Sequence, residues 1–130
     1  MLGKVVLLAS GLIFSAYGLA CFLSPELPAG YAGLEITNGD AFAEMGAMYG
    51  GLQFGFGVFC ILCGLRPDMQ RSGLTLLVLA IGCLAFARFY SAWDADWLVA
   101  GYTWGALAYE TLTAALAAIA LGRGAVATDN

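Results

Sequence analysis

The chain has 130 residues, of which 62% are hydrophobic and 11% are charged, whereas about a quarter of the residues of an ordinary soluble domain are charged. Because a soluble domain would have to expose much of this apolar surface, the composition predicts an integral membrane protein with a single domain over 1–130. The net charge of −4, with five scattered basic residues, argues against a nucleic-acid-binding patch, so we expect no nucleic acid as a partner.

Histidine, the commonest general base and metal ligand, is missing from the chain. We therefore expect no metal site and no cofactor, and we assign no catalytic residue. Cys60 and Cys63 have the C-x-x-C spacing of redox and metal motifs, but they lie within an apolar run rather than after a strand. We interpret them as small apolar residues that pack inside a membrane helix.

A first transmembrane helix is predicted over 4–23, because residues 5–23 carry no charge and about 20 apolar residues suffice to cross a bilayer. This run is too long for the apolar core of a signal peptide, and no A-x-A-like cleavage site precedes Pro25, so we expect the helix to be retained. Its small residues form a stripe of Gly11, Ser15 and Gly18. The longest polar connection follows over 24–42, where Asn38-Gly39-Asp40 predicts a turn.

A glycine-rich second helix is predicted over 43–65. Glycine costs about 1 kcal/mol per helix position relative to alanine in water, and its usual role in a membrane is to let helix backbones approach closely. With the periodicity of an α-helix, one stripe of this segment consists of Gly46, Gly50, Gln53, Gly57, Cys60 and Gly64. The opposite face carries Gly51, Gly55 and Glu44. We therefore expect neighbours on both sides of this helix, and the second face could equally meet another copy of the chain.

A third helix is predicted over 72–91 and a fourth over 97–122. A short acidic loop with Trp93 and Trp97 lies between them, and we expect these two tryptophans at the outer membrane interface. If all four helices span the membrane, the side opposite the acidic loops receives Lys4, Arg66, Arg71 and Arg123. The positive-inside rule then places both termini in the cytoplasm. We expect an all-α membrane protein with four transmembrane helices in an antiparallel bundle.

Three ionisable residues, Glu44, Arg88 and Glu110, do not fit the predicted loops. Glu110 lies about 20 Å along the fourth helix, near the membrane midplane, where an isolated charge costs about 3 kcal/mol or more. It must therefore face the other helices and either pair or be protonated, and Arg88 is the cation that can approach it from within the membrane. We predict an interhelical polar cluster whose members are Glu44, Arg88 and Glu110, with Tyr49, Gln53 and Thr103 as hydrogen-bond partners.

This cluster has three interpretations. It could be a staple that fixes the register of the helices, or it could line a polar pocket or a proton-linked path open to the outer face. In the third interpretation, Arg88 extends toward the membrane surface and a protonated Glu110 has no role.

The entry to the second helix reads Glu44-Met45-Gly46-Ala47-Met48-Tyr49-Gly50-Gly51. With this segment the chain resembles the DUF4345 family, small bacterial membrane proteins of unknown function, and the resemblance covers most of the chain. The positions that match the family's characteristic residues are Glu44, Tyr49, Gly50, Gly51, Arg88 and Glu110. Many members have an arginine where this chain has Gly46, so Arg88 could serve both glutamates here. The resemblance implies a bacterial inner-membrane location, and a looser likeness to DoxX-type proteins concerns architecture, which does not carry function.

We predict a non-enzymatic membrane module, either an accessory subunit of a larger membrane complex or a binder of a small apolar ligand or lipid. The alternative is a small transporter or channel-like protein that uses Glu110 and Arg88, and it predicts a wet cavity that reaches Glu110. An enzyme acting on a lipid would instead need Glu44, Tyr49 and Arg88 together at headgroup level. The expected partners are the lipid bilayer and either further copies of the chain or a larger membrane complex.

Overall fold

Every regular element of the described chain is a helix. The computed structural model describes residues 1–126, with side chains to residue 123, and this range contains no strand. Four helical segments are long and apolar enough to cross a membrane, namely Leu2–Leu23, Gly39–Leu65, Pro67–Asp94 and Gly101–Arg123. The predicted all-α membrane fold with four spanning helices is therefore confirmed, and the orientation of the termini stays a prediction.

The chain divides into two compact units. One comprises Leu8–Leu62, and the other comprises Met1–Leu7 together with the chain from Cys63 onward. The single domain expected over 1–130 stays a prediction.

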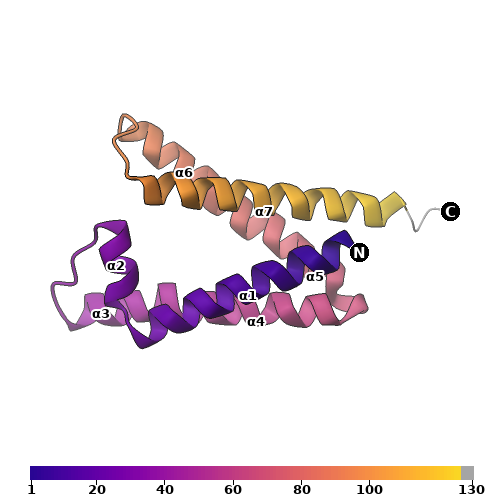
Figure 1. Ribbon diagram of the computed structural model, residues 1–130, viewed down its shortest axis with the longest axis horizontal. Helices are drawn as coiled ribbons and strands as arrows, with labels where there is room; N and C mark the ends of the chain where they lie inside the picture. The colour runs from indigo at the N-terminus through magenta and orange to yellow at the C-terminus, as the bar shows by residue number, and fades with distance from the viewer. Residues whose placement is uncertain (127–130) are drawn as a thin grey trace. The chain divides into compact units, whose positions relative to one another are not determined.

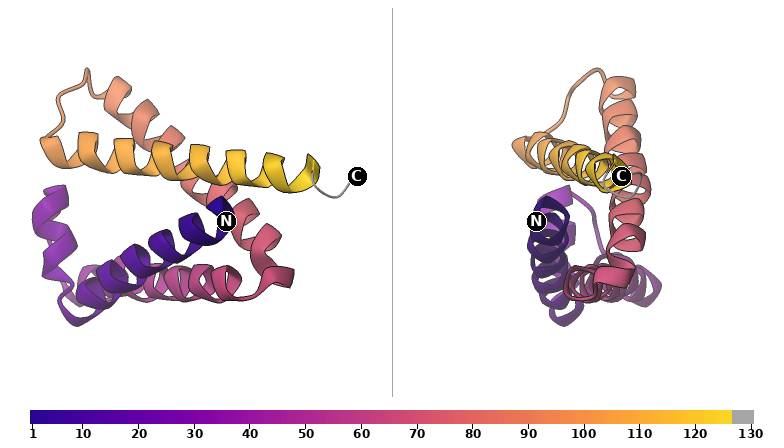
Figure 2. Two further views of the ribbon diagram at one scale, coloured as in Figure 1. Left: turned by 45° about the vertical axis from the view of Figure 1, so that its right-hand side comes forward. Right: turned by 90° about the vertical axis from the view of Figure 1, so that its right-hand side faces the viewer.

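The unit Leu8–Leu62 is a pair of antiparallel helices with shorter helices between them. The pair is α1 (Leu2–Leu23) and α4 (Leu52–Leu65), which lie side by side (Figures 1 and 2), and the connection contains α2 (Glu26–Ala32), α3 (Gly39–Met45) and the π-helical segment η1 (Gly46–Gly51). Gly33 ends α2 with a φ of 69°, a left-handed conformation that glycine adopts without strain. Asn38 caps α3 by accepting a hydrogen bond from the backbone N–H of Ala41 at 2.9 Å, so Gly39 and Asp40, where a turn was predicted, instead begin a helix.

Glycines bring α1 into close contact with η1 and α4. A Cβ atom at Gly11 would lie 2.7 Å from a side-chain atom of α4, and one at Gly50 would lie 2.7 Å from Phe22 Cα, in both cases well inside van der Waals distance. Cβ atoms at Gly18 and Gly57 would overlap the backbone of the facing helix. The two backbones therefore approach at the small residues of both stripes, as in other tightly packed membrane helices.

The opposite face of the second span (Gly39–Leu65) is loosely packed. A Cβ atom at Gly51 or Gly55 would meet no described atom within 4 Å, so these two glycines do not make the close helix contact that was expected of them. Gly46 has a looser contact than Gly50, since its Cβ would lie 3.7 Å from Pro25, and Gly64 is buried.

The other unit is built on a helical hairpin. Its first arm is the third span, which consists of η2 (Pro67–Met69), α5 (Gln70–Leu76), the π-helical segment η3 (Leu77–Ile81) and α6 (Gly82–Asp94). Its second arm is α7 (Gly101–Val126), which runs antiparallel to α6 (Figures 1 and 2). α7 contacts α5, η3 and α6 in turn. A Cβ atom at Gly73 would lie 2.5 Å from Cys63 Cβ, which shows this cysteine in the packing role expected of a small apolar residue.

The turn between α6 and α7 has two consecutive left-handed residues that are not glycine. Asp96 has a φ of 51° and Trp97 a φ of 60°. The backbone N–H of Trp97 donates to Ala92 O at 2.9 Å, and that of Asp96 donates to Trp93 O at 3.0 Å, so the chain closes over the end of α6. Left-handed residues cannot continue a right-handed helix, which explains why the fourth helix begins at Gly101 rather than at residue 97, where its apolar run begins.

Candidate functional site

Arg88 on α6 and Glu110 on α7 form a bidentate ion pair within one unit. Arg88 Nε donates to Glu110 Oε2 at 2.9 Å and to Oε1 at 3.1 Å, and a terminal nitrogen of Arg88 donates to Oε1 at 2.7 Å. The exposed fraction of the side chain is 6% for Glu110 and 24% for Arg88. Two parallel charge-assisted hydrogen bonds fix both the distance and the relative orientation of the two groups.

The position of Glu110 explains why it needs this partner. It lies nine residues after Gly101, or about 14 Å into α7, well inside a span. Thr113 and Ala117, one and two turns further on the same face, are also buried, so this face is turned toward the helices that pack on α7. A carboxylate left unpaired at this depth would cost several kcal/mol, and the guanidinium of Arg88 offsets that cost.

Arg88 reaches Glu110 because of the face on which α6 places it. Buried residues recur along the third span at Gly73, Leu77, Ile81 and Ala85, so they are four residues apart. An α-helix has 3.6 residues per turn, and the wider turn of the π-helical segment Leu77–Ile81 takes up the difference. Arg88 follows on this same buried side, toward α7.

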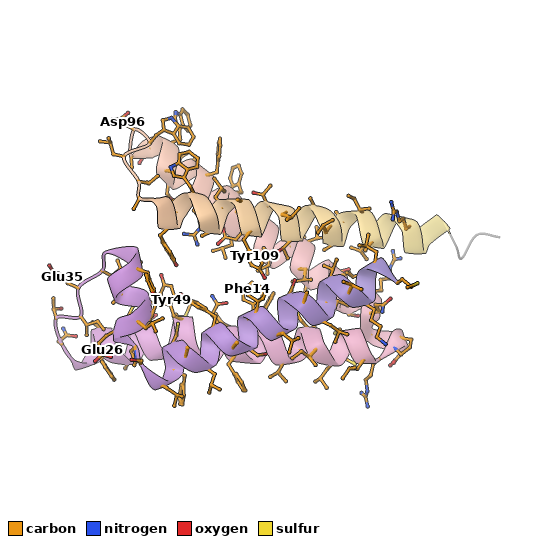
Figure 3. All side chains as sticks on the ribbon, viewed as in Figure 1. Phe14, Glu26, Glu35, Tyr49, Asp96 and Tyr109 are labelled. Atoms are coloured by element: carbon orange, nitrogen blue, oxygen red, sulfur yellow. The ribbon has the colours of Figure 1, made fainter. Side chains whose placement is uncertain are left out.

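The other predicted members of the cluster divide between the two units. Thr103 lies on α7, in the unit of Arg88 and Glu110, and is half-buried. In the unit Leu8–Leu62, Glu44 is exposed at the end of α3, whereas Tyr49 on η1 (Figure 3) and Gln53 on α4 are half-buried. The structure brings together Arg88 and Glu110, and a cluster that also includes Glu44, Tyr49 and Gln53 stays a prediction.

An apolar groove lies between α1 and the second span, within the unit Leu8–Leu62. It has a volume of about 290 Å³ and is lined by Leu19, Phe22, Gly51 and Phe54. The absent side chain of Gly51 leaves the space open, because a Cβ there would meet nothing within 4 Å. Sequence reasoning singled out Gly51 for packing but missed the three larger residues, which carry no signal beyond being apolar.

The described residues offer no site for a metal ion. No group of three or more histidine, cysteine, aspartate or glutamate side chains is placed to hold one in this part of the chain. Cys60 and Cys63 are fully buried and form no disulfide. The two sites described above are the Arg88–Glu110 ion pair and the apolar groove.

The sequence matches a family model described as a domain of unknown function, DUF4345, over residues 2–121. The chain belongs to the DUF4345 family. This match confirms the resemblance that was based on the entry to the second helix, and it includes Arg88, Glu110 and the residues of the groove. No curated protein and no solved structure matches this DUF4345 chain. The family description names no activity, so the function of this DUF4345 protein has to be argued from its sites.

Proposed function

We propose that this DUF4345 protein is a non-enzymatic membrane module that binds a small apolar ligand or a lipid in the groove between α1 and the second span. The observation that carries this proposal is the groove itself, whose lining residues are Leu19, Phe22, Gly51 and Phe54. All four are apolar, so an occupant gains from apolar contact and finds no hydrogen-bonding group in the lining. A lipid acyl chain has this chemistry and is abundant at the surface of a membrane span.

The groove also has a physical reason to persist. The backbones of α1 and the second span are in close contact at two places beside the groove. Gly18 of α1 lies against the backbone of Phe54, and Gly50 of the second span lies against the backbone of Phe22. Further approach of the two helices is blocked, so the groove cannot close by their moving together. We infer that the site is pre-formed, which lowers the cost of ordering a ligand.

The test uses the native mass spectrum of the protein after mild delipidation. Gly51→Leu fills the groove, whereas Gly105→Leu adds the same side chain at a position on α7 that also has open space around its Cβ. We expect a retained lipid or apolar molecule on the wild type and on Gly105→Leu, and its loss from Gly51→Leu. Equal retention by all three proteins would refute the groove as a binding site.

The exposed Gly55 of the second span supports an accessory-subunit role. A Cβ atom at Gly55 would meet no described atom within 4 Å, and a small residue on the surface of a span favours a closely packed partner helix. Gently solubilised native membranes should then yield a complex far heavier than the 13.5 kDa chain, and Gly55→Leu should release the chain from it. A mass that is a small multiple of the mass of one chain indicates a homo-oligomer. A mass equal to that of one chain excludes both the larger complex and the homo-oligomer.

A small transporter or channel-like protein is the second candidate, because an ion pair inside a membrane span is a common mark of an ion or proton path. This function requires water to reach the carboxylate of Glu110. Infrared difference spectra of the wild type and Glu110→Gln in deuterium oxide test it. Rapid exchange and a pH-dependent Glu110 band favour transport, whereas a carboxylate closed to exchange favours a staple with Arg88.

A further inference from the structure

We propose that the hairpin between α6 and α7 is a binding surface for the ammonium group of a zwitterionic phospholipid headgroup. This surface, here called the aromatic hairpin, combines exposed aromatic rings with two carboxylates that have no cation partner. It lies in the unit that combines Met1–Leu7 with the chain from Cys63 onward, whereas the groove between α1 and the second span lies in the unit Leu8–Leu62. The proposal therefore does not depend on the function proposed for that groove.

The aromatic part is an ordered platform of three rings. Trp97 and Trp104 stack with ring centroids 5.7 Å apart and planes 15° from parallel, and the ring of Phe89 meets Trp97 edge-on at 5.4 Å. All three side chains remain more than 40% exposed. Exposed faces of tryptophan attract cations through the ring quadrupole, and this is how proteins recognise quaternary ammonium groups such as choline.

The backbone fixes this platform in place. Trp97 could not stack on Trp104 if α6 and α7 were joined by a regular helical path, and the left-handed conformations of Asp96 and Trp97 provide the reversal. Hydrogen bonds from the N–H groups of these two residues to the last turn of α6 hold it. An aromatic surface that is fixed before binding loses little conformational freedom when a headgroup arrives.

The charge of the aromatic hairpin selects a cation. Asp94 and Asp96 are exposed, and no ion pair is formed by either within the described residues. The sequence has no lysine or arginine between Arg88 and Arg123, and Arg88 is engaged by Glu110. The end of α6 carries a negative partial charge and the start of α7 a positive one, so the two helix dipoles offset each other here. The carboxylates of Asp94 and Asp96 therefore make the electrostatic potential of the aromatic hairpin negative.

The location limits what that cation can be. The aromatic hairpin joins two helices that are long and apolar enough to span a membrane, so it reaches one membrane surface, where aromatic residues contact lipid headgroups. Ethanolamine and choline headgroups present an ammonium at this level. The headgroup of phosphatidylglycerol carries a negative charge and no ammonium, and the carboxylates of Asp94 and Asp96 would repel it.

Spin-label electron paramagnetic resonance tests this preference in reconstituted membranes. Chain-labelled phosphatidylethanolamine, phosphatidylcholine and phosphatidylglycerol are compared by the fraction immobilised at the protein. We expect the two zwitterionic lipids to be favoured over phosphatidylglycerol by about two- to fivefold, the range of an exposed cation–π contact. The variant Asp94→Asn/Asp96→Asn should abolish most of the difference, and asparagine still tolerates the left-handed backbone at position 96.

Two controls separate the aromatic hairpin from general effects. Asp40→Asn removes one exposed carboxylate from the first turn of α3, and Phe86→Leu removes an exposed ring of α6 that is 70% accessible. Both should keep the wild-type preference, whereas Trp104→Leu should reduce it. A preference that is absent from the wild type, unchanged in the double variant, or lost equally in Asp40→Asn overturns the proposal.

A soluble probe distinguishes a lipid headgroup from a free cation. Choline chloride is titrated against the tryptophan fluorescence of the detergent-solubilised protein, with sodium chloride at equal ionic strength as the reference. We expect the choline and sodium titrations to coincide up to millimolar concentrations, because the lipid is already confined to the surface by its acyl chains. A saturable choline response below that concentration assigns the site to a soluble ammonium compound and overturns the lipid source.

Discussion

At the scale of single residues, the pairing of Glu110 could be inferred from the sequence, whereas its geometry could not. A carboxylate placed deep in an apolar run needs a cation, and Arg88 was the candidate that could reach it from within the membrane. The bidentate contact at 2.7–3.1 Å depends on the relative rotation of α6 and α7, which no local pattern encodes. The groove residues were missed for the same reason, since an apolar side chain looks alike whether it faces lipid, a neighbour or a cavity.

The ion pair predicts an asymmetry between single and double substitutions. Arg88→Met leaves Glu110 buried without a partner, and breaking a buried pair costs about 3–5 kcal/mol. The double variant Arg88→Met/Glu110→Leu removes both charges, and replacing a buried ion pair by apolar residues is often neutral or stabilising, so we expect the double variant to be more stable than the single variant by about 3 kcal/mol or more. Unfolding titrations in mixed micelles measure the free energy of unfolding of the single and the double variant. A double variant that is no more stable than Arg88→Met alone would show that the ion pair does not hold α6 and α7 together.

At the scale of elements, the stripes of small residues predicted which faces of the helices meet, but not which of them find a neighbour within the chain. Gly18 and Gly57 lie against facing backbone, while Gly51 and Gly55 face open space. The two π-helical segments could not be predicted, because a wide turn depends on packing along the whole helix and not on a sequence signal of its own. The left-handed pair Asp96-Trp97 was equally unforeseen, since tryptophan has no preference for that conformation.

Two glycine substitutions distinguish the packed face of the helix pair from its open face. Gly18→Leu forces four extra carbon atoms against the backbone of the second span, and overpacking of this kind costs about 1–3 kcal/mol or more. Gly55→Leu places the same side chain where nothing is displaced, so we expect a change within about 0.5 kcal/mol. Thermal unfolding of the two variants in detergent provides the comparison, and equal destabilisation would contradict the observed contact between α1 and the second span.

At the scale of the whole molecule, composition alone predicted the fold class. A chain that is 62% hydrophobic and 11% charged has few alternatives to spanning helices, because backbone polar groups in lipid must be satisfied within each segment. The family could also be inferred from one eight-residue segment. The division into two compact units could not, since both units share the same composition and helix type.

The distribution of charge predicts the orientation of the molecule in the membrane. By the positive-inside rule, the positions of Lys4, Arg66, Arg71 and Arg123 predict that both termini lie in the cytoplasm, and a bacterial inner membrane stays the predicted location. A fluorescent protein fused after the last residue should therefore fold and fluoresce, and alkaline phosphatase inserted after Glu35 should be active in the periplasm. The opposite pair of results would reverse the orientation and move the aromatic hairpin to the cytoplasmic face.

The π-helical turn at Leu77–Ile81 lets the ion pair tolerate the loss of one residue. This turn holds about one residue more than an α-helix that rotates by the same angle, so deleting the exposed Leu79 would let it become an ordinary α-helix and leave Arg88 on nearly the same side relative to Gly73. One alanine inserted between Gly82 and Ala87 would instead rotate Arg88 by about 100° around the helix axis, away from Glu110. We expect the deletion to keep the ion pair and the insertion to break it, although neither changes a charged residue. Relatives that are one residue shorter between Gly73 and Arg88 can therefore keep the same pair.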